Sequence, residues 1–427
     1  MTTHETLFKY FGYTSFRPAQ ETLIDAQLSG KDVLGVMPTG AGKSICFQIP
    51  ALMLSGVTLV ISPLISLMKD QVFQLRKGYI PAAFINSSLT AEQYREVLSR
   101  TKRGAYKIIY VAPERLETEL FQRFALEMEI SLIAVDEAHC VSQWGQDFRP
   151  SYLRIDKFVK KLSNRPIIGA FTATATADVK KDIIRLLGLN DPLNLTTGFD
   201  RPNLYFGIEK PKNKVKYFHE LIDQRTEMCG VVYCSTRKAV DSLTAQLQRK
   251  GICASRYHAG LEDEERRENQ DDFIQNKISV MVATNAFGMG IDKPDVRYVI
   301  HYNIPKNLES YYQEAGRAGR DGKPSECIML FSTEDIRTAE FFINGSGNNS
   351  ELTERQRRNV SYRDTVRLDK MIKYCEVESC LRAYMLGYFG ERQKGRCGNC
   401  SNCNRPSWWA LIKSRLGEGL SGFTLEL

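Results

Sequence analysis

The segment MPTGAGKS at residues 37–44 has the composition and order of a loop that binds phosphate groups. Its glycines let backbone N–H groups approach phosphate closely, and the start of a following helix favours negative charge. Lys43 would reach the β- and γ-phosphates of a nucleoside triphosphate, and the Ser44 hydroxyl would bind Mg²⁺. The usual pattern begins with Gly, where this chain has Met37, so a chance glycine-rich turn is the alternative. The candidate nucleotide-binding residues of the loop are Thr39, Gly40, Gly42, Lys43 and Ser44.

An acidic pair follows an apolar run in VDEAH, residues 135–139. Asp136 would hold Mg²⁺ through water, and Glu137 would orient and deprotonate an attacking water as general base. Acidic residues at a strand end are also common in turns. Combined with the phosphate loop, however, the pair predicts hydrolysis of a triphosphate.

Two arginines follow much later in YYQEAGRAGRDG, residues 311–322. On a helix, Arg317 and Arg320 would share one face because they are three residues apart. Their planar guanidinium groups suit the charge that spreads over a transferring γ-phosphoryl group. The alternative is a helix with two solvated arginines. If the arginines belong to a second domain, hydrolysis would be coupled to domain closure, as in a motor.

Five of the eleven cysteines crowd between Cys375 and Cys403. Thiolates bind Zn²⁺ tetrahedrally, and the tight turns of CGNCSNC would let three of them converge. We expect the fourth ligand to come from the preceding helix, and Cys375 to serve packing, although it could compete as a ligand. An iron–sulfur cluster is the alternative metal group. The predicted zinc ligands are Cys380, Cys397, Cys400 and Cys403.

Short apolar runs rich in Val and Ile alternate with polar helical stretches in two series. Such runs suit parallel strands buried on both faces, and the alternation predicts doubly wound α/β sheets. We expect two α/β domains joined near residues 201–214, followed by a linker at 343–352. The expected strands lie at 32–38, 57–63, 107–113, 132–138 and 167–174, then at 230–235, 278–285, 296–303 and 326–332.

The net charge of +8 and the pI of about 8.8 fit either a well-solvated surface or a polyanionic partner such as nucleic acid. No apolar run is long enough to span a bilayer, and the first residues lack the features of a signal peptide. These features predict a cytoplasmic protein with no membrane partner.

In their order along the chain, these motifs resemble the RecQ family of superfamily 2 DNA helicases over roughly residues 7–404. FGYTSFRPAQ at 11–20 resembles the family's motif ahead of the phosphate loop. The resemblance implies that Tyr13 stacks on adenine, and that Arg17, Gln20 and Gln313 help to bind the nucleotide. Later matching segments are SPLISLMKDQ at 62–71, TATAT at 172–176, YCSTRK at 233–238, YHAGL at 257–261 and ATNAFGMGIDK at 283–293.

SQWGQDFRPSY at 142–152 resembles the aromatic-rich loop of this family. Trp144 and Phe148 could stack on unpaired bases while Arg149 meets phosphate, and Ser142 belongs to the same DNA-coupling set. Packing of the aromatic rings is the alternative. The family usually has His where this chain has Gln146, which cannot carry a proton charge.

The resemblance implies two tandem RecA-like domains at 1–206 and 207–342, a helical zinc-binding segment at 343–406, and a short tail at 407–427. It also implies an ATP-dependent 3′–5′ DNA helicase of repair and recombination that uses ATP, Mg²⁺ and Zn²⁺. We expect a monomer that acts on single-stranded and forked DNA, with a single-strand-binding protein as a further partner and, in a bacterium, association with the nucleoid. Alternatives are a translocase that unwinds poorly, a DNA clamp without turnover, and an RNA helicase.

The family normally continues into a winged-helix domain, and the tail does not resemble its start. We therefore expect a truncated chain or an altered reading frame. Within the tail, WWALIKSRL could form a short amphipathic helix whose Trp408 and Trp409 seek a partner.

Overall fold

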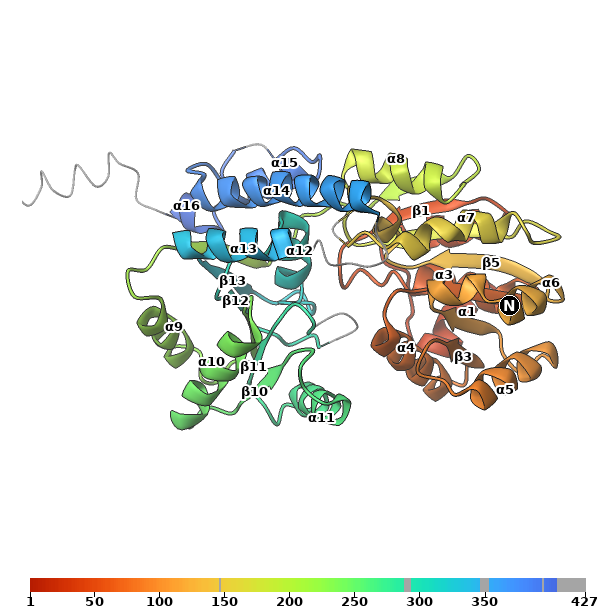
Figure 1. The fold of residues 1–427 in the computed structure, drawn as a ribbon, viewed down its shortest axis with the longest axis horizontal. Coiled ribbons are helices and arrows are strands. Elements are labelled where there is room, and N and C mark those ends of the chain that lie inside the picture. The colour runs from red at the N-terminus through yellow and green to blue at the C-terminus, as the bar shows by residue number, and fades with distance from the viewer. Residues whose placement is uncertain (146, 288–292, 346–352, 394, 405–427) are drawn as a thin grey trace, which may run out of the picture.

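A computed structural model describes residues 1–145, 147–287, 293–345, 353–393 and 395–404. Two α/β bodies lie next to each other, and a group of helices covers one side of the second (Figure 1). Gln146, residues 288–292 of the glycine-rich segment at 283–293, residues 346–352 of the expected linker, and the tail with its two tryptophans lie outside the described residues.

The first body is built on a seven-stranded parallel sheet in the order β3-β4-β2-β5-β6-β1-β7. Its strands are β1 (Val33–Val36), β2 (Val57–Ile61), β3 (Ala82–Ile85), β4 (Ile108–Val111), β5 (Ile130–Val135), β6 (Ile167–Thr172) and β7 (Leu193–Thr196). Its helices are α1 (Thr3–Phe11), α2 (Gln20–Leu28), α3 (Ile45–Met53), α4 (Ile65–Lys77), α5 (Ala91–Lys102), α6 (Glu119–Leu126), α7 (Arg154–Val159) and α8 (Ala177–Leu186). Short 3₁₀ helices lie at Pro113–Glu117, Ala138–Val141 and Pro150–Leu153.

The second body has a six-stranded parallel sheet in the order β10-β11-β9-β12-β13-β8. Its strands are β8 (Leu204–Glu209), β9 (Gly230–Tyr233), β10 (Ala254–Tyr257), β11 (Val280–Ala283), β12 (Tyr298–His301) and β13 (Ser325–Leu330). Its helices are α9 (Lys214–Asp223), α10 (Arg237–Arg249), α11 (Asp263–Ile274), α12 (Leu308–Ala315) and α13 (Thr333–Gly345). The C-terminal helices are α14 (Glu354–Glu376), α15 (Leu381–Tyr388) and α16 (Ser401–Asn404).

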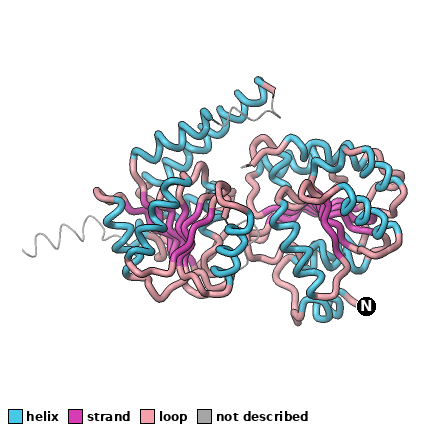
Figure 2. Tube along the Cα trace, turned by 60° about the horizontal axis from the view of Figure 1, so that its bottom comes forward, coloured by secondary structure: helices cyan, strands magenta, loops and turns pink. Residues whose placement is uncertain are grey.

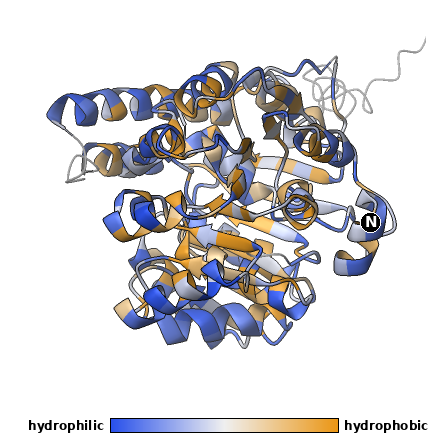
Figure 3. Cartoon of the chain, turned by 90° about the vertical axis from the view of Figure 1, so that its right-hand side faces the viewer, coloured by the Kyte–Doolittle hydropathy of each residue, from blue (hydrophilic) through white to orange (hydrophobic). Residues whose placement is uncertain are grey.

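Every expected apolar run contains a strand. Strands such as β1, β4, β9 and β12 are buried at all four positions, because helices cover both faces of each sheet (Figure 2). Hydrophobic residues accordingly gather on the strands, and hydrophilic residues on the outer helices (Figure 3). The predicted fold class, two doubly wound parallel-sheet domains with a helical segment, is confirmed.

The expected joint at 201–214 was wrong in one respect, because residues 204–209 of it form strand β8. This edge strand pairs with β13 along its whole length, from Leu204 to Glu209. Its Tyr205 and Glu209 are half-buried, whereas the central strands are buried throughout. The domain boundary predicted after residue 206 falls inside β8, and the boundary after residue 342 falls inside α13.

Among the helices of the described residues, none is long and apolar enough to cross a membrane.

Candidate nucleotide site and metal centre

The phosphate loop lies between the end of β1 and the start of α3. Gly40 and Gly42 have φ values of 86° and 79°, which residues with a side chain rarely adopt. The Lys43 ammonium donates to the Met37 carbonyl at 3.2 Å. The Met37 side chain is buried, with its sulfur 3.6 Å from Cys46 Sγ. The core therefore accommodates a side chain where the usual pattern has glycine.

The acidic pair follows β5 directly, and β6 separates β5 from β1 in the sheet. Because the carboxyl ends of parallel strands share one edge, the pair lies beside the phosphate loop. Burial raises the pKa of Asp136, and repulsion from Glu137 adds to this effect. Burial lowers the pKa of Lys43, and the two carboxylates oppose this effect. A half-buried cation and two carboxyl groups thus share one cluster.

His139 connects Glu137 to the threonine-rich segment after β6. Its Nδ1 lies 2.8 Å from Thr172 Oγ1 and 3.3 Å from Glu137 Oε2. Burial lowers the pKa of His139, which favours a neutral ring. The backbone of Asp136 is held separately, because the Tyr152 hydroxyl donates to its carbonyl at 2.9 Å.

Two residues that precede the phosphate loop in the chain bind its backbone carbonyls. Gln20 Nε2 donates to the carbonyls of Ala41 and Gly42 at 3.2 and 3.0 Å, and Arg17 binds the Gly40 carbonyl. The Tyr13 side chain is 55% exposed, so it does not serve core packing in this structure. Stacking of its ring on adenine stays a prediction.

The two arginines lie in a turn and not on a helix, which corrects the sequence-based expectation. Helix α12 ends at Ala315, and Gly319 has a φ of 55° that breaks the helical path before Arg320. The turn nevertheless faces the first domain. A Cβ atom built on Gly40 would lie 3.5 Å from Arg320 Cγ, and the positive charge of Arg317 lowers the pKa of Glu137 against the larger effect of burial.

Gln313, on α12 of the second domain, also contacts the first domain, since its Nε2 lies 3.4 Å from Thr174 Oγ1. The structure therefore brings together the phosphate loop, the acidic pair, the threonine segment, Gln313 and both arginines.

Two residues that sequence reasoning missed hold the arginine turn. Arg201 donates to the Gly316, Ala318 and Gly319 carbonyls at 3.2, 3.0 and 2.8 Å. Asn203 donates to Gly319 O at 2.9 Å and to Lys323 O at 3.0 Å. Both precede β8, in the segment expected to be a joint. In the sequence they are marked only as polar residues on either side of Pro202, which does not indicate a contact with the turn.

The aromatic-rich loop starts just after the 3₁₀ helix that follows Glu137. Ser142 donates to Asp182 on α8 at 2.6 Å and accepts from the Trp144 backbone at 3.0 Å. Trp144 is 43% exposed, whereas Phe148 is half-buried. Arg149 donates to the Pro63 carbonyl at 2.9 Å and pairs with Asp147, so its guanidinium supports the loop in this state.

The four predicted zinc ligands converge, with all four Sγ atoms within 4.8 Å of one another. The Cys397 and Cys403 sulfurs are 3.8 Å apart. That separation is the edge of a sulfur tetrahedron with Zn–S bonds of about 2.3 Å, so the site fits zinc. Cys375 is buried, with its sulfur 3.5 Å from Met329 Sδ, which confirms its packing role.

Cys380 does not belong to the preceding helix, contrary to expectation. Helix α14 ends at Glu376, and Cys380 is the N-cap of α15. The break turns its thiol toward the other three. Asn402 stabilises the broken segment by donating to the Val377 and Ser379 carbonyls at 2.6 and 2.9 Å.

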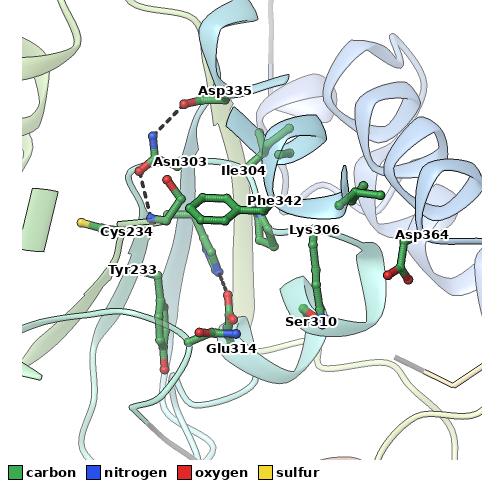
Figure 4. Close-up of a pocket in the computed structure, with 16 residues that line it drawn as sticks. Tyr233, Cys234, Asn303, Ile304, Lys306, Ser310, Glu314, Asp335, Phe342 and Asp364 are labelled. Carbon is green, nitrogen blue, oxygen red and sulfur yellow. Dashed lines mark hydrogen bonds and ion pairs between the residues drawn. The ribbon is translucent and has the colours of Figure 1, made fainter. Parts of the chain in front are cut away.

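A cavity of about 370 Å³ lies at the carboxyl ends of β9 and β12 (Figure 4). Asn303 bridges its floor, accepting from the Ser235 N–H at 3.1 Å and donating to Asp335 at 2.7 Å. His301 and Glu314 face each other at 2.9 Å beneath it. The motifs did not reveal this cavity, because its lining comes from separated segments.

Two facing α/β domains with one phosphate loop between them define the core of a nucleotide-driven motor of the helicase class. Three family models match the chain: the DEAD/DEAH box helicase at residues 17–182, the helicase conserved C-terminal domain at 213–322, and RecQ zinc-binding at 333–404. The chain belongs to the RecQ family of superfamily 2 helicases.

Among similar proteins, the Bacillus subtilis ATP-dependent DNA helicase RecQ is 47% identical over 93% of this chain and 66% of its own length. The probable ATP-dependent DNA helicase RecS of B. subtilis is 36% identical over 97% of this chain and 94% of its own length. The chain spans slightly less than two thirds of the bacterial RecQ proteins it matches.

Solved structures agree in fold. The DUF1998 helicase MrfA bound to DNA has a TM-score of 0.67 at 19% identity, covering 92% of this chain and 58% of that one. Saccharomyces cerevisiae Dbp5 bound to RNA and ADP BeF3 has a TM-score of 0.63 at 18% identity, covering 85% of this chain and 96% of its own.

Proposed function

We propose that this chain is an ATP-dependent DNA helicase that moves 3′ to 5′ on single-stranded DNA and separates duplexes during repair and recombination. The observation that carries the proposal is the position of Arg320, whose side chain lies against Gly40 of the phosphate loop across the domain interface. Relatives described as ATP-dependent DNA helicases support the choice of DNA as substrate.

Hydrolysis would use groups from both domains. Lys43 would neutralise the β- and γ-phosphates, and Glu137 would take a proton from the attacking water. Burial raises the pKa of Glu137, which makes its carboxylate a stronger base. Arg317 and Arg320 would stabilise charge on the transferring γ-phosphoryl group.

Mg²⁺ would supply further charge neutralisation, held by Ser44 and, through water, by Asp136. Asp136 and Glu137 are carboxylate donors beside the phosphate loop, the hard oxygen ligands that Mg²⁺ prefers.

Binding of DNA to the aromatic-rich loop would affect the position of the hydrolytic carboxylate, Glu137. The loop is separated from Glu137 only by the 3₁₀ helix Ala138–Val141, and Ser142 binds Asp182 on the helix that follows the threonine segment. A base that stacks on Trp144 would therefore pull on the backbone beside Glu137. Such a connection favours an ATPase whose rate depends on DNA.

ATP turnover measured with and without a single-stranded oligonucleotide tests the proposal. A strong rise in rate with DNA is expected, and an unchanged rate contradicts it. Strand separation on 3′-tailed and 5′-tailed duplexes then tests polarity. Stimulated turnover without unwinding would favour a translocase, whereas DNA binding without any turnover would favour a clamp.

Replacing Lys43 with alanine is expected to lower ATP turnover by at least roughly 10²-fold, the loss typical of one preorganised charge. It also removes the positive charge of the phosphate loop that acts on Asp136 and Glu137. Steady-state ATPase measurements with saturating DNA check this result. Lys31→Ala is the matched control, because Lys31 is half-exposed and pairs only with exposed Asp191 at 3.4 Å, so its turnover should match the parent.

Replacing Gly319 with alanine should displace the arginine turn. A Cβ there would lie 2.5 Å from Asn203 Nδ2, at a φ of +55°. A shift of about 1 Å at a catalytic group can cost roughly 10- to 100-fold in rate, while ATP binding to the first domain persists. Gly322→Ala is the control, because its φ of +80° is equally strained but nothing lies within 4 Å. Equal turnover in both variants would contradict this role for the turn.

A further inference from the structure

Helix α14 grips the aromatic-rich loop through two arginines. The Arg363 guanidinium lies over the Trp144 ring, 4.2 Å from its centroid. Its Nη1 also donates to Gln143 Oε1 at 2.7 Å. One turn further along α14, Arg367 donates to the Gln143 carbonyl at 3.4 Å. Two consecutive loop residues are therefore held by one face of a single helix.

These contacts connect the second body to the first domain. Helix α14 packs against α12, α13 and α15 of the second, zinc-bearing body and extends toward the first domain (Figure 1). Its Leu368 and Met371 are buried in that packing. The gripped loop belongs to the first domain, where Ser142 is anchored to Asp182 of α8. The position of Trp144 therefore depends on contacts from both bodies.

Arg363 orients the indole without burying it, because Trp144 is still 43% exposed. A planar cation on one ring face restricts rotation of the indole and leaves ring surface for a stacked base. Burial lowers the pKa of Arg363, and the positive charge of Arg367 adds to this effect whereas Asp182 opposes it. Arg367 is itself paired with Asp364 at 3.0 Å, so Arg363 is the arginine directed at the ring.

We propose that Arg363 is a positioning residue that presents Trp144 to single-stranded DNA and so links the zinc-bearing body to DNA sensing. This inference rests on the proposed function, because Trp144 is taken as the stacking platform. Without the guanidinium, the indole samples more orientations and the Gln143 side chain loses its contact with residue 363. Binding of DNA must then restrict the indole and the loop, which lowers the affinity for DNA.

Arg363→Ala tests this inference, with DNA binding followed by anisotropy of a fluorescent single-stranded oligonucleotide in the absence of ATP. The affinity should fall by roughly 2- to 30-fold, the factor that corresponds to one cation–π contact. In ATPase assays, the DNA concentration for half-maximal stimulation should rise by the same factor. The rate at saturating DNA should change less than twofold. A thermal unfolding temperature equal to that of the parent chain verifies that the variant is folded.

A double-mutant cycle with Trp144→Ala separates positioning from direct contact with phosphate. If Arg363 acts through Trp144, Arg363→Ala has no further effect in the Trp144→Ala background. Additive losses in the double variant would overturn the inference. Arg358→Ala is the matched control, an exposed arginine of α14 that pairs with Glu354 on the same helix, and it should retain parental affinity.

The binding assay also distinguishes this inference from the proposed function. A parent chain that binds the oligonucleotide without DNA-stimulated turnover contradicts the helicase, while the cycle still decides the role of Arg363. A parent with stimulated turnover and an unaffected Arg363→Ala variant contradicts the inference alone. A parent that does not bind the oligonucleotide contradicts both.

Discussion

Replacing Arg320 with alanine is expected to lower ATP turnover by about 10³- to 10⁵-fold, the range associated with an arginine finger. The side chain lies against Gly40 of the phosphate loop although it belongs to the second domain. Charge develops on the γ-phosphoryl group mainly in the transition state, so turnover should suffer far more than ATP binding. Single-turnover hydrolysis and nucleotide binding, measured on the same preparation, separate the two quantities.

Arg249→Ala serves as the control for loss of an arginine in the second domain, because Arg249 is exposed at the end of α10. Its turnover should equal that of the parent. An Arg320→Ala variant that loses ATP affinity and turnover in equal proportion would mean that the arginine only binds the ground state.

Removal of zinc is the second large effect that we expect. The metal segment is fastened to the edge of the second sheet. The backbone of Cys400 pairs with that of Phe206 in a parallel β-bridge. Asn399 Nδ2 donates to the Pro202 and Leu204 carbonyls at 3.1 Å each. Structural zinc sites of this kind contribute about 10–16 kcal/mol in isolated peptides. Loss of the metal should therefore unfold the segment and expose the edge of β8.

Cys400→Ser should purify with less than one zinc per chain and show a lower thermal unfolding temperature, and a strong chelator should do the same to the parent. Cys253→Ser is the matched control, since Cys253 is exposed and lies outside the cluster. A Cys400→Ser variant with full zinc content and unchanged unfolding would show that the four thiols do not hold the metal.

The sequence predicted those parts of the molecule that local patterns determine. Central strands such as β1 and β5 are continuous apolar runs because both faces are covered, and the phosphate loop follows from residues adjacent in the chain. The cysteine ligands were predictable for the same reason, since three of them lie within seven residues. Their spacing along the chain was enough to predict a shared metal site, without any contact between distant segments.

The remaining features depend on contacts between distant residues. Strand β8 is an edge strand whose partner lies more than a hundred residues away, so its own sequence carries little signal. The arginine turn was predicted to be helical from the three-residue spacing of Arg317 and Arg320, whereas Gly319 between them has a positive φ. Arg201 and Asn203 donate to carbonyls of that turn, and Arg363 contacts a loop in the other domain.

A structure of the chain with a non-hydrolysable ATP analogue and single-stranded DNA is the most direct measurement of the shared nucleotide site. Lys43 from the first domain and the guanidinium of Arg320 from the second should both lie within hydrogen-bond distance of the γ-phosphate. A γ-phosphate reached only by first-domain groups, with the turn at 316–320 withdrawn from it, would contradict a catalytic site built from two domains.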